Sequence, residues 1–164
     1  MSKQIVGLFL VAICASCAVA KDASGGRGVP PTLSGLEMAP INFNSGEPQA
    51  VKSLIPSLDG EFAKQAIDRD LMIVKKYSDL RFEILGFTDN EECSPSECQK
   101  LSARRAEAVH SWMIANGASP SSFRRVEGLG AEMPIADNST EEGRSVNRRV
   151  EVNQVPQEAD GGSQ

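Results

Sequence analysis

Two charged side chains, Asp89 and Arg105, could do chemistry because of where the sequence places them. Asp89 lies just past the strand-like segment 81–87, so a turn would present its carboxylate at the end of a buried strand. Arg105 interrupts a stripe of apolar residues that recur at steps of three and four, the spacing of one helix face. A guanidinium in that position can face a pocket that holds an anionic partner.

Each of these residues also has a purely structural interpretation. An Asp in a turn commonly accepts hydrogen bonds from its own backbone. An Arg at the edge of an apolar stripe can extend its charged head into solvent. From the residues alone, both interpretations stay open for Asp89 and for Arg105.

The sequence indicates neither a catalytic site nor a metal site. His110 is the only histidine, which argues against a His-based triad and against a His-rich metal centre. No nucleophile and base stand at a spacing that would pair them, because neighbours on a helix such as His110 and Ser111 diverge. We therefore expect no catalytic residues, no metal and no cofactor.

Composition predicts a soluble, acidic protein with one domain. A chain of 164 residues can bury one core of modest size. A formal charge of −5 argues against a nucleic-acid partner, which is held mainly through phosphate contacts. One Trp, one Tyr and six Phe provide no obvious aromatic platform for stacking bases or sugars.

The elements that must position Asp89 and Arg105 alternate between strands and helices. Period-two patterns predict strands, and steps of three and four predict helices. Asn116-Gly117 marks the end of the second helix. The pattern favours an α+β or α/β sandwich, a sheet with helices packed on one face. In chain order we expect a strand at 39–44, a helix at 61–76, a strand at 81–87, a helix at 96–115, a strand at 123–128, a loop at 134–142 and a last strand at 146–153.

Residues 1–20 have the pattern of a secretory signal peptide. Lys3 precedes the apolar run 5–13, and Ala18-Val19-Ala20 has the small-x-small form of a cleavage site. The run is too short to cross a hydrocarbon core of about 30 Å. One alternative stays open, in which Cys17 carries a lipid and anchors the protein to a membrane.

The rest of the chain divides into an arm, a domain and a tail. Residues 21–36 are rich in Gly, Ser and Pro, which is typical of a flexible arm. Residues 37–153 carry the alternating pattern and form the domain. Residues 154–164 are polar and lack an apolar period, so we expect a disordered tail.

Removal of the first twenty residues leaves two cysteines, Cys93 and Cys98. An even count in an oxidising compartment favours a disulfide, and a metal site would need further ligands. The loop that contains them also carries Glu91, Glu92 and Glu97, and we expect these acidic side chains to be solvated.

Four motifs, in order and at matching spacing, resemble the OmpA-like C-terminal domain. That domain also occurs in peptidoglycan-associated lipoprotein and in the flagellar stator protein MotB. The resemblance covers about residues 37–153. The motifs are GFTDN at 86–90, LSxxRA at 101–106, GxGxxxPIAxN at 128–138 and GRxxNRRVE at 143–151.

The resemblance implies a βαβαβ-type fold with a mixed sheet, and non-covalent binding of peptidoglycan. In the family, the Asp of Thr-Asp and the Arg of Leu-Ser-x-x-Arg-Ala hold meso-diaminopimelate of the stem peptide, which assigns Asp89 and Arg105. Diaminopimelate ends in a zwitterionic head, so an anion and a fork-shaped cation complement it. The further positions that match the family's pocket are Thr88, Asn44, Leu101 and Arg148.

Two departures from the family pattern keep a second function open. Phe87 stands where the family usually has His, and Cys98 stands where it often has Asn. We expect the Cys93–Cys98 bridge to take over the role of that Asn in holding the loop. The alternative is an interaction module that has lost its wall pocket and binds an envelope protein. A cell-wall hydrolase would need a metal site or an activated nucleophile, and we find neither in the sequence.

These expectations place the protein in the periplasm, associated with the outer membrane. Its partners would be diaminopimelate-type peptidoglycan and an outer-membrane or envelope protein. Contact with the membrane itself would require a lipid on Cys17.

Overall fold

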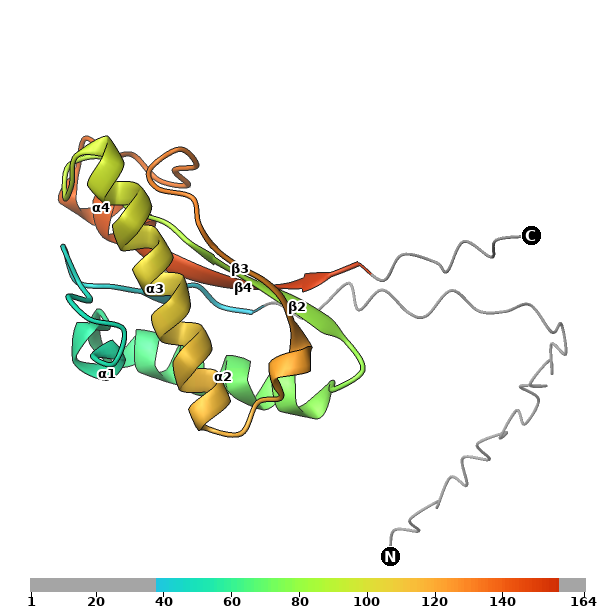
Figure 1. Cartoon of the computed structure of the whole chain (residues 1–164). Helices are drawn as coiled ribbons and strands as arrows, with labels where there is room; N and C mark the ends of the chain where they lie inside the picture. Colours follow the sequence, from blue (N-terminus) through green and yellow to red (C-terminus); the bar gives the residue numbers. More distant parts are fainter. Residues whose placement is uncertain (1–37, 157–164) are drawn as a thin grey trace, which may run out of the picture. The chain divides into compact units, whose positions relative to one another are not determined.

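The computed structural model describes residues 38–156 (Figure 1). Three of the four strands are long enough to form the body of a sheet, and the first contributes a short edge. The elements in chain order are β1 Ile41–Asn42, α1 Leu54–Ser57, α2 Gly60–Lys76, β2 Arg81–Gly86, α3 Pro95–Ala115, the 3₁₀ turn η1 Pro120–Ser122, β3 Phe123–Gly128, α4 Glu141–Asn147 and β4 Arg149–Val155.

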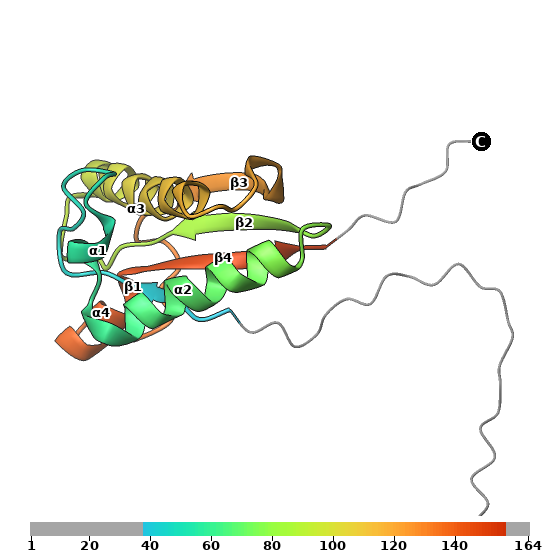
Figure 2. The ribbon, with the colours of Figure 1, turned by 90° about the horizontal axis from the view of Figure 1, so that it is seen from below.

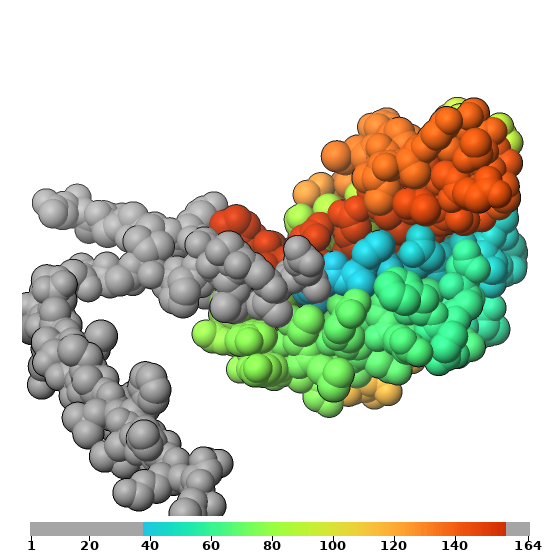
Figure 3. All heavy atoms as spheres, turned by 180° about the vertical axis from the view of Figure 1, so that it is seen from behind, coloured from blue at the N-terminus to red at the C-terminus, as the bar shows by residue number. Residues whose placement is uncertain are grey.

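The four strands form one mixed sheet in the order β1-β4-β2-β3. β2 pairs parallel to β3, whereas β4 pairs antiparallel to both β2 and β1. The two long helices α2 and α3 lie on the same face of this sheet (Figures 1 and 2). From behind, the segment that contains β1 lies between α2 and the α4–β4 segment (Figure 3). The predicted α+β class, with a mixed sheet and helices on one face, is confirmed.

The core lies between the sheet and the two long helices. Alternate residues of β2 and β4 point toward the helices, because successive side chains of a strand face opposite sides. Those residues meet the apolar stripes of α2 and α3. The contributors from these four elements include Phe82, Ile84, Val150, Val152, Ile67, Val74, Val109 and Met113, each with 1% of its surface exposed or less.

Two glycines let α3 approach the sheet closely enough to bring Arg105 to the end of β2. A Cβ on Gly86 would lie 2.0 Å from the carbonyl oxygen of Ser102, and one on Gly128 would lie 2.1 Å from the nitrogen of Ala103. No side chain fits at either position, so the absence of a Cβ is what permits this packing.

Four predicted elements agree closely with the structure, and several details are wrong. The predicted helices at 61–76 and 96–115 match α2 and α3, and the predicted strands at 81–87 and 123–128 match β2 and β3. The first strand is shorter than predicted, at Ile41–Asn42. The three- and four-residue steps of α2 would place Phe62 on its apolar stripe, but Phe62 is 65% exposed, and the buried positions include Asp70.

The segment around residues 141–155 corrects two expectations. A last strand was predicted from residue 146, but residues up to Asn147 belong to the short helix α4, and β4 runs from Arg149 to Val155. The side chain of Thr140 caps this helix by accepting a hydrogen bond from the N–H of Gly143. The predicted tail at 154–164 therefore begins too early, since Gln154 and Val155 pair with β2. The four-residue helix α1 was not predicted.

The ends of the described chain come together at one edge of the domain. Met38 and Gln154 line the same cavity, together with Ala39, Pro40 and Arg69. The predicted signal peptide at 1–20, Cys17, the arm at 21–36 and the tail beyond residue 156 lie outside the described residues. Across residues 38–156, no helix is both long and apolar enough to cross a membrane.

Candidate functional site

Asp89 lies in the loop after β2 and is almost completely buried, with 1% of its side chain exposed. Its Oδ1 accepts hydrogen bonds from the backbone N–H groups of Glu91 and Glu92, both at 2.7 Å. Its Oδ2 accepts from Nη1 of Arg148 at 2.9 Å. Burial acts to raise the pKa of Asp89, but these hydrogen bonds outweigh it and hold the pKa below its ordinary value. Asp89 is therefore a turn residue and one half of an ion pair.

Arg105 lies on α3 and is completely buried. Its Nη1 and Nη2 donate to the two carboxylate oxygens of Glu92, at 2.6 and 2.8 Å. The remaining N–H groups donate to backbone carbonyl oxygens of Glu47 at 2.8 Å, Phe87 at 2.9 Å and Asn44 at 3.2 Å. A guanidinium has five N–H donors, so the internal bonds of Arg105 use all of them.

Glu92 connects three separate segments of the domain at this point. Besides Arg105, its Oε2 accepts from the N–H of Gly46 at 2.7 Å, and its Oε1 accepts from the N–H of Asp89 at 3.3 Å. Its side chain is only 1% exposed. The expectation that the acidic loop residues are solvated is therefore wrong for Glu92, because a buried guanidinium and two N–H groups compensate its charge.

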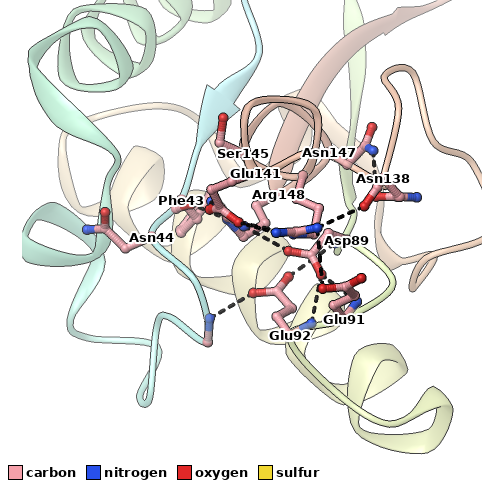
Figure 4. A network of polar contacts seen from close by, with 12 residues as sticks. Phe43, Asn44, Asp89, Glu91, Glu92, Asn138, Glu141, Ser145, Asn147 and Arg148 are labelled. Carbon is pink, nitrogen blue, oxygen red and sulfur yellow. Dashed lines mark hydrogen bonds and ion pairs between the residues drawn. The ribbon is translucent and has the colours of Figure 1, made fainter.

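Arg148 lies between two acidic side chains (Figure 4). Nη1 donates to Asp89, Nη2 donates to Glu141 at 2.7 Å, and Nε donates to the carbonyl oxygen of Phe43 at 3.3 Å. Hydrogen bonds from Arg148 and Arg144 lower the pKa of Glu141. The network therefore extends from the end of β2 to the start of α4.

The other predicted site residues contribute in different ways. The Oγ1 of Thr88 is buried and has no hydrogen-bond partner, while its N–H donates to the carbonyl oxygen of Gly130. Leu101 is buried on α3. Asn44 is exposed, and its side chain donates to the carbonyl oxygen of Leu58 and is directed away from Arg148 (Figure 4).

Three of the six predicted residues, Asp89, Arg148 and Arg105, are thus held in two ion pairs that Glu92 connects. Asp89 pairs with Arg148, and Arg105 pairs with Glu92, which sequence reasoning had placed in solvent. Glu141 and Arg144 were also missed as members of the network. A signal was available for Glu92, because a buried arginine needs a carboxylate nearby and the adjacent loop is acidic.

The predicted disulfide between Cys93 and Cys98 is present, with 5.2 Å between the Cα atoms. It closes the loop at the start of α3, directly after Glu92. Cys98 is 3% exposed, so the bridge anchors the acidic loop to the buried side of the helix. In the described part of the chain, no three His, Cys, Asp or Glu side chains are placed to hold a metal ion.

The sequence of the chain matches one protein family and several known proteins. Residues 56–148 match the OmpA family. Over 85 residues, the chain is 39% identical to the probable lipoprotein YiaD of Escherichia coli, covering 52% of this chain and 38% of that protein. Over 116 residues, it is 39% identical to the peptidoglycan-binding protein ArfA of Mycobacterium tuberculosis, covering 68% of this chain and 33% of that one. The matches thus span little more than a third of these relatives.

Solved structures agree with the fold. The C-terminal domain of Helicobacter pylori MotB superposes with a TM-score of 0.58 at 25% identity, over 73% of this chain and 85% of that domain. The peptidoglycan-associated lipoprotein of Burkholderia pseudomallei superposes with a TM-score of 0.58 at 19% identity, over 71% and 89% of the two chains. The second likeness concerns the fold alone.

Proposed function

Because the chain belongs to the OmpA family, we propose that it binds peptidoglycan non-covalently and holds an envelope component at the cell wall. The observation that carries this proposal is the match to ArfA, a relative named as peptidoglycan-binding, across 68% of the chain. The proposed location is the periplasm, close to the outer membrane, with an envelope protein as a further partner.

The proposed ligand is the diaminopimelate residue of the stem peptide, and Asp89 is the proposed acceptor of its ammonium group. Asp89 stays ionised because its pKa is lowered. The contacts described leave a second acceptor position on its Oδ2, since a carboxylate oxygen has two lone pairs. Thr88 supplies an unpartnered hydroxyl next to it. Asn44 and Leu101 complete the proposed surroundings.

The proposed positive part of the site consists of Arg148 and Arg105. Arg148 is buried and already pairs with Asp89 and Glu141, so its proposed role is to position Asp89. Arg105 has the fork shape that suits a ligand carboxylate, but its guanidinium holds Glu92. A ligand carboxylate reaches Arg105 only if Glu92 leaves.

A second candidate function is an interaction module that binds an envelope protein and no longer binds the wall. One observation favours it, because Asp89 and Arg105 are both internally paired and at most 1% exposed. The residue at position 87 also favours this second function. It is buried and lies under the guanidinium of Arg149 at 3.9 Å, where the family usually has a polar His.

Co-sedimentation with purified peptidoglycan tests the proposal directly. We would compare the wild-type protein with Asp89→Asn, which keeps the shape of the side chain and removes its charge. The matched control is Asp68→Asn, which removes an exposed carboxylate from α2. Binding by the wild type and the control, with a loss in Asp89→Asn, is expected.

Equal binding by all three proteins would reject Asp89 as the ammonium acceptor. Absence of binding by the wild type would reject the wall function in favour of a protein partner. Release of soluble wall fragments, measured in the same samples, would show that the protein cleaves the wall instead of only binding it.

A further inference from the structure

We propose that Glu92 sets the ligand selectivity of this site, because its carboxylate occupies the position on Arg105 that a ligand carboxylate would take. The inference rests on the proposed wall binding and goes beyond it by stating which part of the stem peptide is recognised. The site then binds the ammonium group through Asp89 and does not bind the second carboxylate, which distinguishes diaminopimelate from lysine.

The geometry of the Glu92–Arg105 pair carries this inference. Both carboxylate oxygens face both terminal nitrogens, at 2.6 and 2.8 Å, in the parallel arrangement that a bound carboxylate ligand would adopt. Three backbone carbonyl oxygens take the remaining donors of Arg105. No N–H of Arg105 remains for a ligand, and the side chains of the pair are 0% and 1% exposed.

Glu92 is also fixed independently of Arg105. The N–H groups of Gly46 and Asp89 donate to its oxygens, and the neighbouring Cys93–Cys98 bridge anchors its loop to α3. A carboxylate held on the same chain competes with a dissolved ligand at a high effective concentration. A ligand that approaches from solvent must displace the four hydrogen bonds that the Glu92 oxygens accept, two from Arg105 and one each from Gly46 and Asp89. Glu92 makes these bonds without loss of translational freedom.

The test compares two kinds of wall that differ in this carboxylate. Wild type, Glu92→Ala and Glu91→Ala are each sedimented with diaminopimelate-type and with lysine-type peptidoglycan. Glu91→Ala is the matched control, because it removes one negative charge from the same loop. In the wild type, Glu91 pairs with Arg144 and its side chain is 61% exposed. The double variant Glu92→Ala/Arg105→Ala tests whether any gain depends on the freed guanidinium.

We expect the wild type and Glu91→Ala to bind the two walls within about threefold of each other, which is the range of roughly one weak polar contact. Glu92→Ala should bind diaminopimelate-type wall about tenfold more tightly and leave lysine-type wall unchanged, since it exposes a charged hydrogen-bonding group. The double variant should lose this gain. A strong preference of the wild type for diaminopimelate-type wall, unchanged in Glu92→Ala, would overturn the inference.

A second measurement separates this inference from the wall function and from loss of folding. The Nε–H signal of Arg105 is followed by NMR while sodium acetate is added to wild type and to Glu92→Gln, which keeps the side-chain volume. A shift in Glu92→Gln but not in wild type supports the inference even if no protein binds any wall. Equal shifts in both proteins, or none in either, would count against it.

Discussion

The Cα of Gly86 lies directly against the backbone of Ser102, so that a Cβ on Gly86 would be 2.0 Å from the Ser102 carbonyl oxygen. This contact joins the end of β2 to the middle of α3, one turn before Arg105. Because the end of β2 also leads into Asp89, the same contact sets the position of the two predicted ligand residues relative to each other.

Gly86→Ala should therefore destabilise the domain strongly, by about 3 kcal/mol or more, since the backbone of α3 must move to accept the methyl group. Thermal unfolding followed by circular dichroism measures the loss. The control is Gly60→Ala, because Gly60 has a φ of 77° but no atom within 4 Å of the added Cβ. That variant should lose only about 1–2 kcal/mol from backbone strain. Equal losses in the two variants would contradict the steric argument.

Asp70 should make stability depend on pH between its unfolded and folded pKa values, 3.8 and about 7. It is buried on α2, and no side chain donates a hydrogen bond to its carboxylate. Burial raises its pKa to about 7. In the unfolded chain the pKa is near 3.8, so between these two values the folded state binds more protons and stability falls as pH rises.

The free energy of unfolding of the wild type should fall by on the order of 1 kcal/mol for each pH unit across that window, and then level off above about pH 7. Urea titrations at several pH values measure this slope. Asp70→Asn cannot ionise and should show a flatter profile over the same range. A slope that the substitution leaves unchanged would mean that another group titrates there.

The Asp89–Arg148 pair should stabilise the fold at pH values above the unfolded pKa of Asp89. Because the folded pKa of Asp89 is lowered, its contribution is present above its unfolded pKa and is lost as pH falls through the folded value. Asp89→Asn should lower the free energy of unfolding by about 3 kcal/mol at pH 7, because it leaves Arg148 with a weaker partner. Chemical unfolding at pH 7 and at pH 2.5 checks this, and the difference between variant and wild type should shrink at the lower pH.

The Cys93–Cys98 bridge should stabilise the fold by about 2 kcal/mol, because it closes a small loop in the unfolded chain. Reduction, or the pair Cys93→Ser and Cys98→Ser together, should lower the melting temperature by several degrees. Differential scanning calorimetry with and without reductant measures the shift. The double serine variant must give the same melting temperature in both conditions, or the effect of reductant has another origin.

The local periodicity of apolar residues was enough to predict the main helices and strands. Those elements in turn placed Asp89 at the end of a strand and Arg105 on a helix. The partners of those residues could not be predicted in the same way. Glu92 is buried through contacts with Gly46 and Arg105, which are 46 and 13 residues away. Such burial depends on tertiary packing and leaves no periodic pattern in the loop itself.

The missed helix α4 has a similar cause. Its seven residues are too few to show a clear apolar period. Tertiary contacts hold it, since Asn147 at its end bonds the backbone of Ile135 and Ala136 through its side chain. Asp70 shows the opposite case, in which a charged residue occupies a core position that the apolar period alone would assign to a hydrophobic one.

The meeting of Met38 and Gln154 at one cavity has a mechanical consequence. The ion-pair network lies at the opposite end of β4, beside Arg148 and Arg149. If the wall is held at that network, tension applied at the Gln154 end runs lengthwise along β4. The ladder hydrogen bonds between β4 and β2 then share the load in shear and are not peeled apart one after another. The topology thus suits a protein that must resist pulling between two anchored structures.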